Sequence, residues 1–259
     1  MLVHAFLTDG FFPWAELFIE SFKYHNGEDI PIVLCTRNLS NKQIHKLYSL
    51  HNNITIENEK IDLKRLADKF GISYNRLLEY KHQVEKMHIT AESKIWKQYT
   101  SADQRIRSIY ETMKKYTDQD FIFHSDIDMY IRTDLTDLFN LIKDNDISIR
   151  FRLKASTPRK VMGGLIGFKV NEEVFKFMER WEKYLNDVPI PKRKIGYGQS
   201  SFFFAYRDLK NNYKWGDIPQ YYISPKMDQR DKIWSANTMK GKTKNLEICR
   251  RDFEKCKKQ

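Results

Sequence analysis

The sequence predicts an α/β fold, in which a mixed and mainly parallel central sheet is flanked by helices in a single domain spanning residues 1–259. Two observations carry this expectation. In the first third of the chain, short apolar segments alternate with segments that repeat apolar residues every three or four positions. The apolar segment at residues 30–36 is hydrophobic on both faces, as interior strands of a parallel sheet are.

Strands are expected where apolar or alternating segments are bounded by turn residues. The segments that meet this criterion are residues 2–7, 30–36, 54–56, 121–131, 147–152 and 161–168. The last of them contains Gly163, Gly164 and Gly167. Glycine inside a strand marks the close approach of a ligand or of another backbone segment.

Helices are expected between these strands. The first carries Trp14, Phe18 and Phe22 at helical spacing and stops at His25-Asn26-Gly27, and Ser40 is the expected N-cap of the second. Further helical patterns cover most of residues 62–117 and then residues 135–142, 173–185 and the segment after residue 197. Residues 224–245 show no clear periodicity, which predicts a mobile loop.

Composition favours a folded protein of a reducing compartment. Of the 259 residues, 41% are hydrophobic and 14% aromatic, which argues against disorder. The three cysteines are widely spaced and fit neither a disulfide framework nor a zinc site. Neither a signal-peptide pattern nor an apolar run near the roughly 18 residues of a membrane span is present. We therefore expect a cytoplasmic protein.

Two carboxylates define the candidate site. Asp126 and Asp128 follow the apolar segment Phe121–Ser125, and the chain then resumes as Met129-Tyr130-Ile131. Residues i and i+2 of a strand share a face, so at the end of a strand both carboxylates can reach one cation. Oxygen ligands suit Mg²⁺ or Mn²⁺, which usually complete their coordination with water and substrate phosphates. The pair therefore predicts a metal site for a phosphate-bearing ligand, such as a nucleotide-sugar.

The charge of the chain predicts an anionic partner. The formal net charge is +11, and basic residues gather at Lys192-Arg193-Lys194 and over residues 240–258. Such a surface attracts nucleic acid, anionic lipid or diphosphate. The sequence has no helix-turn-helix, zinc-finger or RNP-like pattern, so we expect no nucleic-acid partner. The basic C-terminal segment also suits peripheral contact with the inner face of a membrane.

The order of these motifs resembles that of the GT-A nucleotide-sugar glycosyltransferases, nearest to the galactosyltransferase and glycogenin group, over nearly the whole chain. The resemblance implies a GT-A (Rossmann-like) domain in which residues 1–131 hold the donor and residues 132–259 form the acceptor half and a C-terminal loop. It implies transfer of a sugar from a nucleoside-diphosphate donor, most commonly a UDP-sugar, to a hydroxyl of a glycan or glycoconjugate. The implied cofactor is Mn²⁺ or Mg²⁺.

The resemblance also assigns residues in the donor half. Thr8-Asp9-Gly10 resembles the family's nucleotide-base loop, and Phe12, or the phenylalanine before it, would stack on the base. Arg105 stands where the family places an arginine on the donor, and its planar guanidinium suits phosphate. Asp126 and Asp128 correspond to the family's Asp-x-Asp, which implies that both bind the metal and that Asp126 also bonds the donor.

In the second half the match is partial. Met162-Gly163-Gly164-Leu165 resembles the family's Asn-Ala-Gly segment at the sugar site. Gly198-Gln199 resembles its Asp-Gln pair, which implies that Gln199 is catalytic and lies beside the anomeric carbon. The segment from Thr238 to Lys244 resembles the His-x-x-Gly-x-x-Lys loop, so Gly241 and Lys244 would hold the leaving diphosphate. Thr238 replaces the metal-binding histidine, and its neighbour Asn237 could supply a third metal ligand.

Two other functions are compatible with the residues. Phosphatases of the haloacid-dehalogenase type also place Asp-x-Asp at a strand end, although normally near the N-terminus and before Thr or Val, where Tyr130 stands here. A non-catalytic basic module would bind nucleic acid or anionic membrane in a salt-sensitive way and would ignore Mn²⁺. For a glycosyltransferase, Gln199 favours retention, whereas Asp217, Asp228 and Asp231 are equivalent candidates for the base of an inverting reaction.

Overall fold

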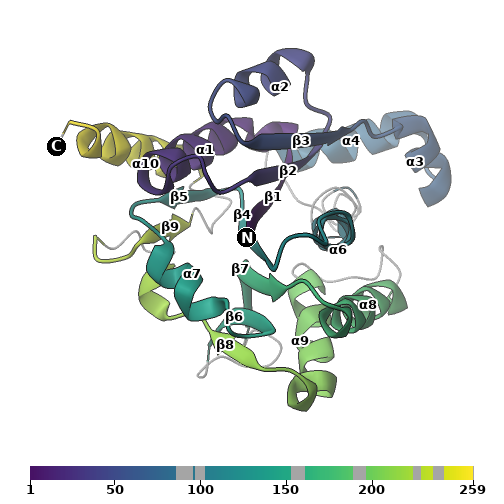
Figure 1. The fold of residues 1–259 in the computed structure, drawn as a ribbon. Helices are drawn as coiled ribbons and strands as arrows, with labels where there is room; N and C mark the ends of the chain where they lie inside the picture. Colours follow the sequence, from purple (N-terminus) through teal and green to yellow (C-terminus); the bar gives the residue numbers. More distant parts are fainter. Residues whose placement is uncertain are drawn as a thin grey trace.

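Within the described residues, the central element is a seven-stranded sheet in the order β3-β2-β1-β4-β7-β6-β8 (Figure 1). The computed structural model describes residues 1–85, 96, 103–152, 161–188, 197–223, 229–235 and 242–258. The strands are β1 (Leu2–Thr8), β2 (Ile32–Arg37), β3 (Ile54–Glu59), β4 (Phe121–Asp126), β6 (Ile147–Phe151), β7 (Val161–Lys169) and β8 (Trp215–Asp217). Among these seven, β7 alone runs antiparallel to its neighbours β4 and β6. The predicted mixed and mainly parallel sheet is confirmed.

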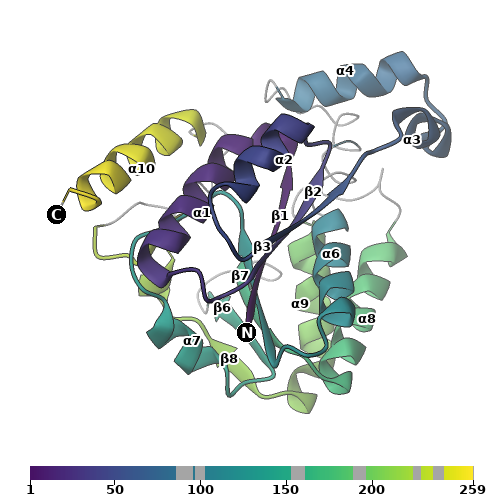
Figure 2. The same ribbon diagram turned by 45° about the horizontal axis from the view of Figure 1, so that its top comes forward.

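Helices cover both faces of this sheet (Figures 1 and 2). On one face pack α1 (Phe12–Asn26), α2 (Asn41–Tyr48) and α7 (Thr136–Ile142). On the other face pack α6 (Asp103–Lys115), α8 (Glu172–Asp187) and α9 (Tyr197–Leu209). The first core includes Phe18, Phe22, Leu47, Phe123 and Leu138, and the second includes Ile106, Ile109, Ile122, Trp181 and Phe202. The predicted α/β layering is therefore confirmed.

Helix ends follow the capping chemistry of the sequence. Ser40 and Gln43 form a reciprocal capping box at the start of α2, as the N-cap prediction required. The helix α3 (Leu63–Phe70) begins after Asp62 and ends at Gly71, whose φ of 64° lies in the left-handed region that suits glycine. It packs with α4 (Tyr74–Glu85) around a small separate cluster that contains Leu66, Leu77, Tyr80 and Trp96.

The expectation of a mobile loop over residues 224–245 is wrong where the structure describes that segment. β9 (Ile233–Ser235) pairs antiparallel with β5 (Met129–Ile131), and α10 (Lys242–Cys256) already includes residue 245. A three-residue strand has no period to read, and its hydrogen bonds come from a partner about 100 residues away. Residues 224–228 and 236–241 lie outside the described residues. The cluster under α10 contains Trp14, Leu17, Tyr130, Trp234, Cys249 and Phe253.

Polar contacts fasten α10 beside β5. Asp252 Oδ2 accepts hydrogen bonds from Tyr130 Oη at 3.1 Å and from Arg132 Nε at 3.0 Å. The Arg132 guanidinium lies 4.0 Å from the centre of the Trp234 ring. Burial, with the nearby Asp252 charge, raises the pKa of Tyr130, so its phenol stays protonated and donates. In the described parts of the chain, none of the helices has the length and apolar character needed to cross a membrane.

Candidate active site

The two predicted carboxylates lie where β4 ends. Asp126 is the last residue of β4, and Asp128 lies in the bend between β4 and β5. β4 is buried up to Ser125 because it lies between β1 and β7, with a hydrophobic core on each face. Both carboxylates are only partly buried. The strand therefore carries them to the carboxyl edge of the parallel strands, which is where α/β sheets bind ligands.

Asp126 forms an ion pair with Arg105. Arg105 Nη1, from the first turn of α6, donates to Asp126 Oδ1 at 2.5 Å, and the two side chains are 22% and 30% exposed. His124 Nε2 lies 3.7 Å from the same oxygen. Burial alone would raise the pKa of Asp126. The charge of Arg105 and the neighbouring His124 together lower the pKa by more than burial raises it, so it lies well below the usual range. The carboxylate is therefore ionised at neutral pH.

The glycines of β7 lie against this pair. A Cβ added to Gly164 would lie 3.2 Å from Asp126 Oδ2 and 2.7 Å from Met129 Cε. A Cβ added to Gly163 would lie 3.7 Å from Arg105 Nη2. The expected close approach of a ligand or of another backbone segment is not what the described residues show, because the side chains of Asp126 and Met129 occupy the space that a side chain at Gly164 would need. The structure thus brings Arg105, Asp126, Gly163 and Gly164 together.

The donor groups fit a hard divalent cation that takes part of its coordination from other sources. Asp126 accepts the hydrogen bond from Arg105 through Oδ1, and its Oδ2 faces Gly164. Asp128, two residues later in the chain, supplies a second carboxylate. Within the described ranges, no group of three or more His, Cys, Asp or Glu side chains could hold a metal ion. Asn237, the predicted third ligand, lies outside the described residues. Two carboxylates suit Mg²⁺ or Mn²⁺ completed by water and phosphate oxygens.

The predicted base loop lies at the same edge of the sheet. β1 and β4 are parallel neighbours in which Phe6 pairs with Asp126, so Thr8 lies two residues beyond that pair. Asp9 begins the short 3₁₀ turn Asp9–Phe11, and Phe12 is the first residue of α1, with a partly buried side chain. Topology therefore places this loop on the side of the sheet that carries the carboxylates.

Two other predicted residues, Gln199 and Lys244, lie on the helices α9 and α10. Gln199, in the first turn of α9, donates its amide Nε2–H to the carbonyl oxygen of Val161 at the start of β7. Its described contact thus fixes the strand that carries Gly163 and Gly164. Lys244 lies in the first turn of α10 with an exposed side chain. Gly241, predicted to act with Lys244, lies outside the described residues.

The sequence interpretation gave no role in the site to a pair of buried histidines. His4 Nδ1, in β1, lies 2.9 Å from His124 Nδ1, in β4, and both residues are fully buried. The available signal was one polar residue inside each of two apolar strands. Their proximity follows from the β1–β4 register, which pairs His4 with His124. That register cannot be read from either strand alone.

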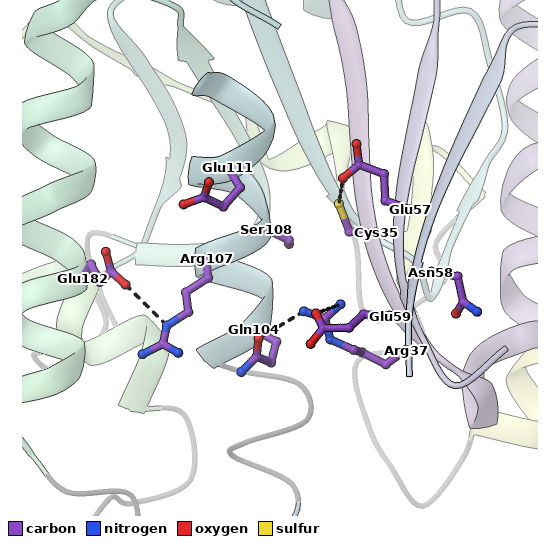
Figure 3. Close-up of a pocket in the computed structure, with 10 residues that line it drawn as sticks. All are labelled: Cys35, Arg37, Glu57, Asn58, Glu59, Gln104, Arg107, Ser108, Glu111 and Glu182. Atoms are coloured by element: carbon purple, nitrogen blue, oxygen red, sulfur yellow. Dashed lines mark hydrogen bonds and ion pairs between the residues drawn. The ribbon is translucent and has the colours of Figure 1, made fainter. Parts of the chain in front are cut away.

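A separate cavity of about 450 Å³ lies between α6 and the strands β2 and β3 (Figure 3). Inside it Arg37 pairs with Glu59 at 2.7 Å, and Arg107 lies 3.4 Å from Glu182 of α8. Glu57 and Glu111 add two further carboxylates to its lining. Its described lining is more negative than positive and includes none of the predicted site residues, so it does not suit a diphosphate.

The sequence matches no protein-family model and no curated protein. The structure matches solved glycosyltransferases. Over 92% of this chain it resembles the galactosyltransferase LgtC, solved with donor and acceptor sugar analogues, with a TM-score of 0.53, 13% sequence identity and 88% of that chain covered. The chain has the GT-A glycosyltransferase fold.

Two further matches to this fold cover longer proteins. The bifunctional glycosyltransferase WbbM, solved without ligand, matches 92% of this chain with a TM-score of 0.56 and 11% identity. The glycosyltransferase GlyE of Streptococcus pneumoniae TIGR4 matches 92% of it with a TM-score of 0.56 and 12% identity. The chain spans 46% of the WbbM chain and 55% of the GlyE chain. At these identities the likeness is one of fold.

Proposed function

We propose that the protein transfers a sugar from a nucleoside-diphosphate donor, with UDP as the first choice of nucleotide, to a hydroxyl of a glycan or glycoconjugate. The observation that carries this proposal is the geometry of Asp126, whose Oδ1 pairs with Arg105 while its Oδ2 faces Gly164. This arrangement stands at the carboxyl edge of the parallel strands, in a fold shared with glycosyltransferases.

Asp126 and Asp128 are the residues proposed to hold Mn²⁺ or Mg²⁺, which when bound offsets the charge that grows on a leaving diphosphate. Arg105 keeps Asp126 ionised and fixes its orientation. Gly164 lets Asp126 Oδ2 lie against β7 where a Cβ would crowd it, and Gly163 lies beside Arg105. The protein thus supplies a preorganised charged edge instead of groups that must reorganise during reaction.

The remaining roles follow the resemblance. Thr8 and Asp9 would contact the nucleotide base through the loop after β1, and Phe12 would stack on it. Lys244 would contact the leaving diphosphate, and Asn237 would complete the metal coordination. The proposed location of the protein is the cytoplasm. Peripheral membrane contact would involve the exposed basic residues of α10, which include Arg251 and Lys255.

The test is a thermal-shift screen of UDP-, GDP- and other nucleotide-sugars with and without Mn²⁺, followed by donor hydrolysis assays. A ligand that binds only the native state raises the apparent melting temperature. Asp128→Ala should abolish the Mn²⁺-dependent shift and hydrolysis, whereas the exposed Asp144→Ala should leave both unchanged. Full Mn²⁺-dependent hydrolysis by a folded Asp128→Ala variant would refute the metal assignment.

The same assays separate the two alternatives. A phosphatase would release inorganic phosphate from small phosphomonoesters and would not require a nucleotide. A binding module would show neither hydrolysis nor a response to Mn²⁺, and its affinity for anionic vesicles or nucleic acid would fall steeply with salt.

A further inference from the structure

The core contains a polar contact between two buried histidines, His4 and His124. The two imidazoles meet through their Nδ1 atoms at 2.9 Å, on neighbouring parallel strands, with 0% exposure for both residues. In the part of the chain that the structure describes, the Nε2 atom of each ring has no hydrogen-bond partner. Buried polar atoms without partners cost stability, so packing alone does not explain this pair.

The contact allows only two arrangements of protons. Burial lowers the pKa of His4, and the nearby His124 and Arg105 lower it further. His124 is equally buried, and its Nε2 lies 3.7 Å from Asp126 Oδ1, too far for a hydrogen bond to the carboxylate. A buried imidazolium without such a bond is costly, so each ring is neutral and carries one proton. A hydrogen bond between two Nδ1 atoms needs one donor and one acceptor, so the rings must be opposite tautomers.

The surroundings of His124 select one arrangement. If His4 Nδ1 donates, His124 carries its proton on Nε2, and this N–H faces Asp126 Oδ1 at 3.7 Å. In the reverse arrangement a nitrogen lone pair faces the carboxylate, which is repulsive. Each arrangement leaves one Nε2–H without a hydrogen-bond partner, on His124 in the first and on His4 in the reverse. The negative charge of Asp126 therefore decides between them, and it favours His4 as the donor.

We propose that His4 and His124 are positioning residues, in which His4 fixes the tautomer of His124 and the resulting Nε2–H faces Asp126 Oδ1 and attracts it electrostatically beside Arg105. The two groups approach the same carboxylate oxygen from β4 and from α6. Asp126 Oδ2 then remains turned toward Gly164. The catalytic consequence rests on the proposed function, whereas the tautomer assignment does not.

The tautomers can be measured without any activity. The full chain, without ligand, is labelled with ¹⁵N at its seven histidines, and the ring nitrogens are observed by NMR. His4→Asn and His124→Gln variants assign the signals. The expected result is a protonated Nδ1 in His4 and a protonated Nε2 in His124. A protonated Nδ1 in His124 would overturn the proposal whether or not the protein is a glycosyltransferase.

The positioning role is tested by two amide variants of His124. Glutamine carries its amide near the position of Nε2 and can replace the N–H that faces Asp126, whereas the shorter asparagine reaches only the position of Nδ1. The Mn²⁺ concentration for half-maximal UDP-sugar hydrolysis should stay within about twofold for His124→Gln and rise by about tenfold or more for His124→Asn, the effect usual for groups that orient metal ligands.

Melting temperatures of both variants control for folding. A purely structural role would affect the two amides alike, so equal Mn²⁺ requirements in folded variants would overturn the proposal. If the wild-type protein hydrolyses none of the nucleotide-sugars, the proposed function fails, and the NMR result still decides the tautomers.

Discussion

Gly164→Ala should disturb the site through a single added methyl group, and Gly163→Ala provides the matched control. At Gly164 the new Cβ would lie 2.7 Å from Met129 Cε and 3.2 Å from Asp126 Oδ2. The methionine methyl can move aside at small cost. The carboxylate is held by Arg105 and must itself shift by a few tenths of an ångström. At Gly163 the nearest atom is Arg105 Nη2 at 3.7 Å, an ordinary contact.

The comparison of the two variants separates the effect of alanine on the unfolded backbone from the contact of the new Cβ with Asp126 and Met129. Replacing glycine by alanine in a strand stabilises by about 0.5–1 kcal/mol through the unfolded chain, and this gain applies to both positions. Overpacking costs about 1–3 kcal/mol and applies only to Gly164. At about 2–4 °C per kcal/mol for a chain of this size, Gly164→Ala should melt roughly 2–12 °C below Gly163→Ala.

Calorimetry or circular dichroism gives the melting temperatures, and Mn²⁺-dependent UDP-sugar hydrolysis gives the functional effect. Because small displacements of catalytic groups can cost up to about 100-fold in rate, we expect Gly164→Ala to lose at least tenfold more activity than Gly163→Ala. Equal melting temperatures for the two variants would refute the inferred contact between β7 and the Asp126 carboxylate.

Three further predictions concern other parts of the molecule. Asp252→Ala should lower the free energy of unfolding by about 1.5–3 kcal/mol in urea denaturation, because a phenol and a guanidinium lose their shared acceptor, while Glu254→Ala should change it little. Lys244→Ala should weaken UDP binding with Mn²⁺ by about 1–3 kcal/mol in calorimetry, and unchanged affinity would remove Lys244 from the site. Acid should destabilise the protein below about pH 6.5, because the lowered pKa of His4 keeps its ring neutral in the fold while the unfolded chain takes up a proton. His4→Asn should reduce the slope of the unfolding free energy against pH by up to about 1.4 kcal/mol per pH unit. An unchanged slope would contradict the assignment of this pH dependence to His4.

The strongly patterned elements of the fold could be predicted from the sequence. The stripe of Trp14, Phe18 and Phe22 and the cap at Ser40 define α1 and the start of α2 as observed. The third strand was predicted too short, since it continues to Glu59. It is one of the two edge strands of the described sheet, and its polar end is paired with neighbouring cations, Glu57 with Lys115 and Glu59 with Arg37. Such pairing leaves no hydrophobic pattern.

The site was predictable where its chemistry is local in the chain. Asp126, its neighbour Asp128 and the glycines of β7 carry their signal in a few adjacent residues. The partner of Arg105 was not predictable in this way, because its contact with Asp126 depends on how α6 lies against the end of β4. The resemblance placed Arg105 on the donor, and the structure places it on the carboxylate. Both placements of Arg105, on the donor and on the Asp126 carboxylate, lie at the same edge of the sheet.

The strand order also constrains how the protein folds. β1 pairs with β2 and β3 follows, so this three-stranded unit can form from the first 59 residues. The opposite side of β1 must wait for β4, about 120 residues away in the chain. Such distant pairing closes a long loop and slows folding. Until β4 arrives, β1 presents an open hydrogen-bonding edge that other chains can occupy, so molecular chaperones or dilution should matter most during this interval.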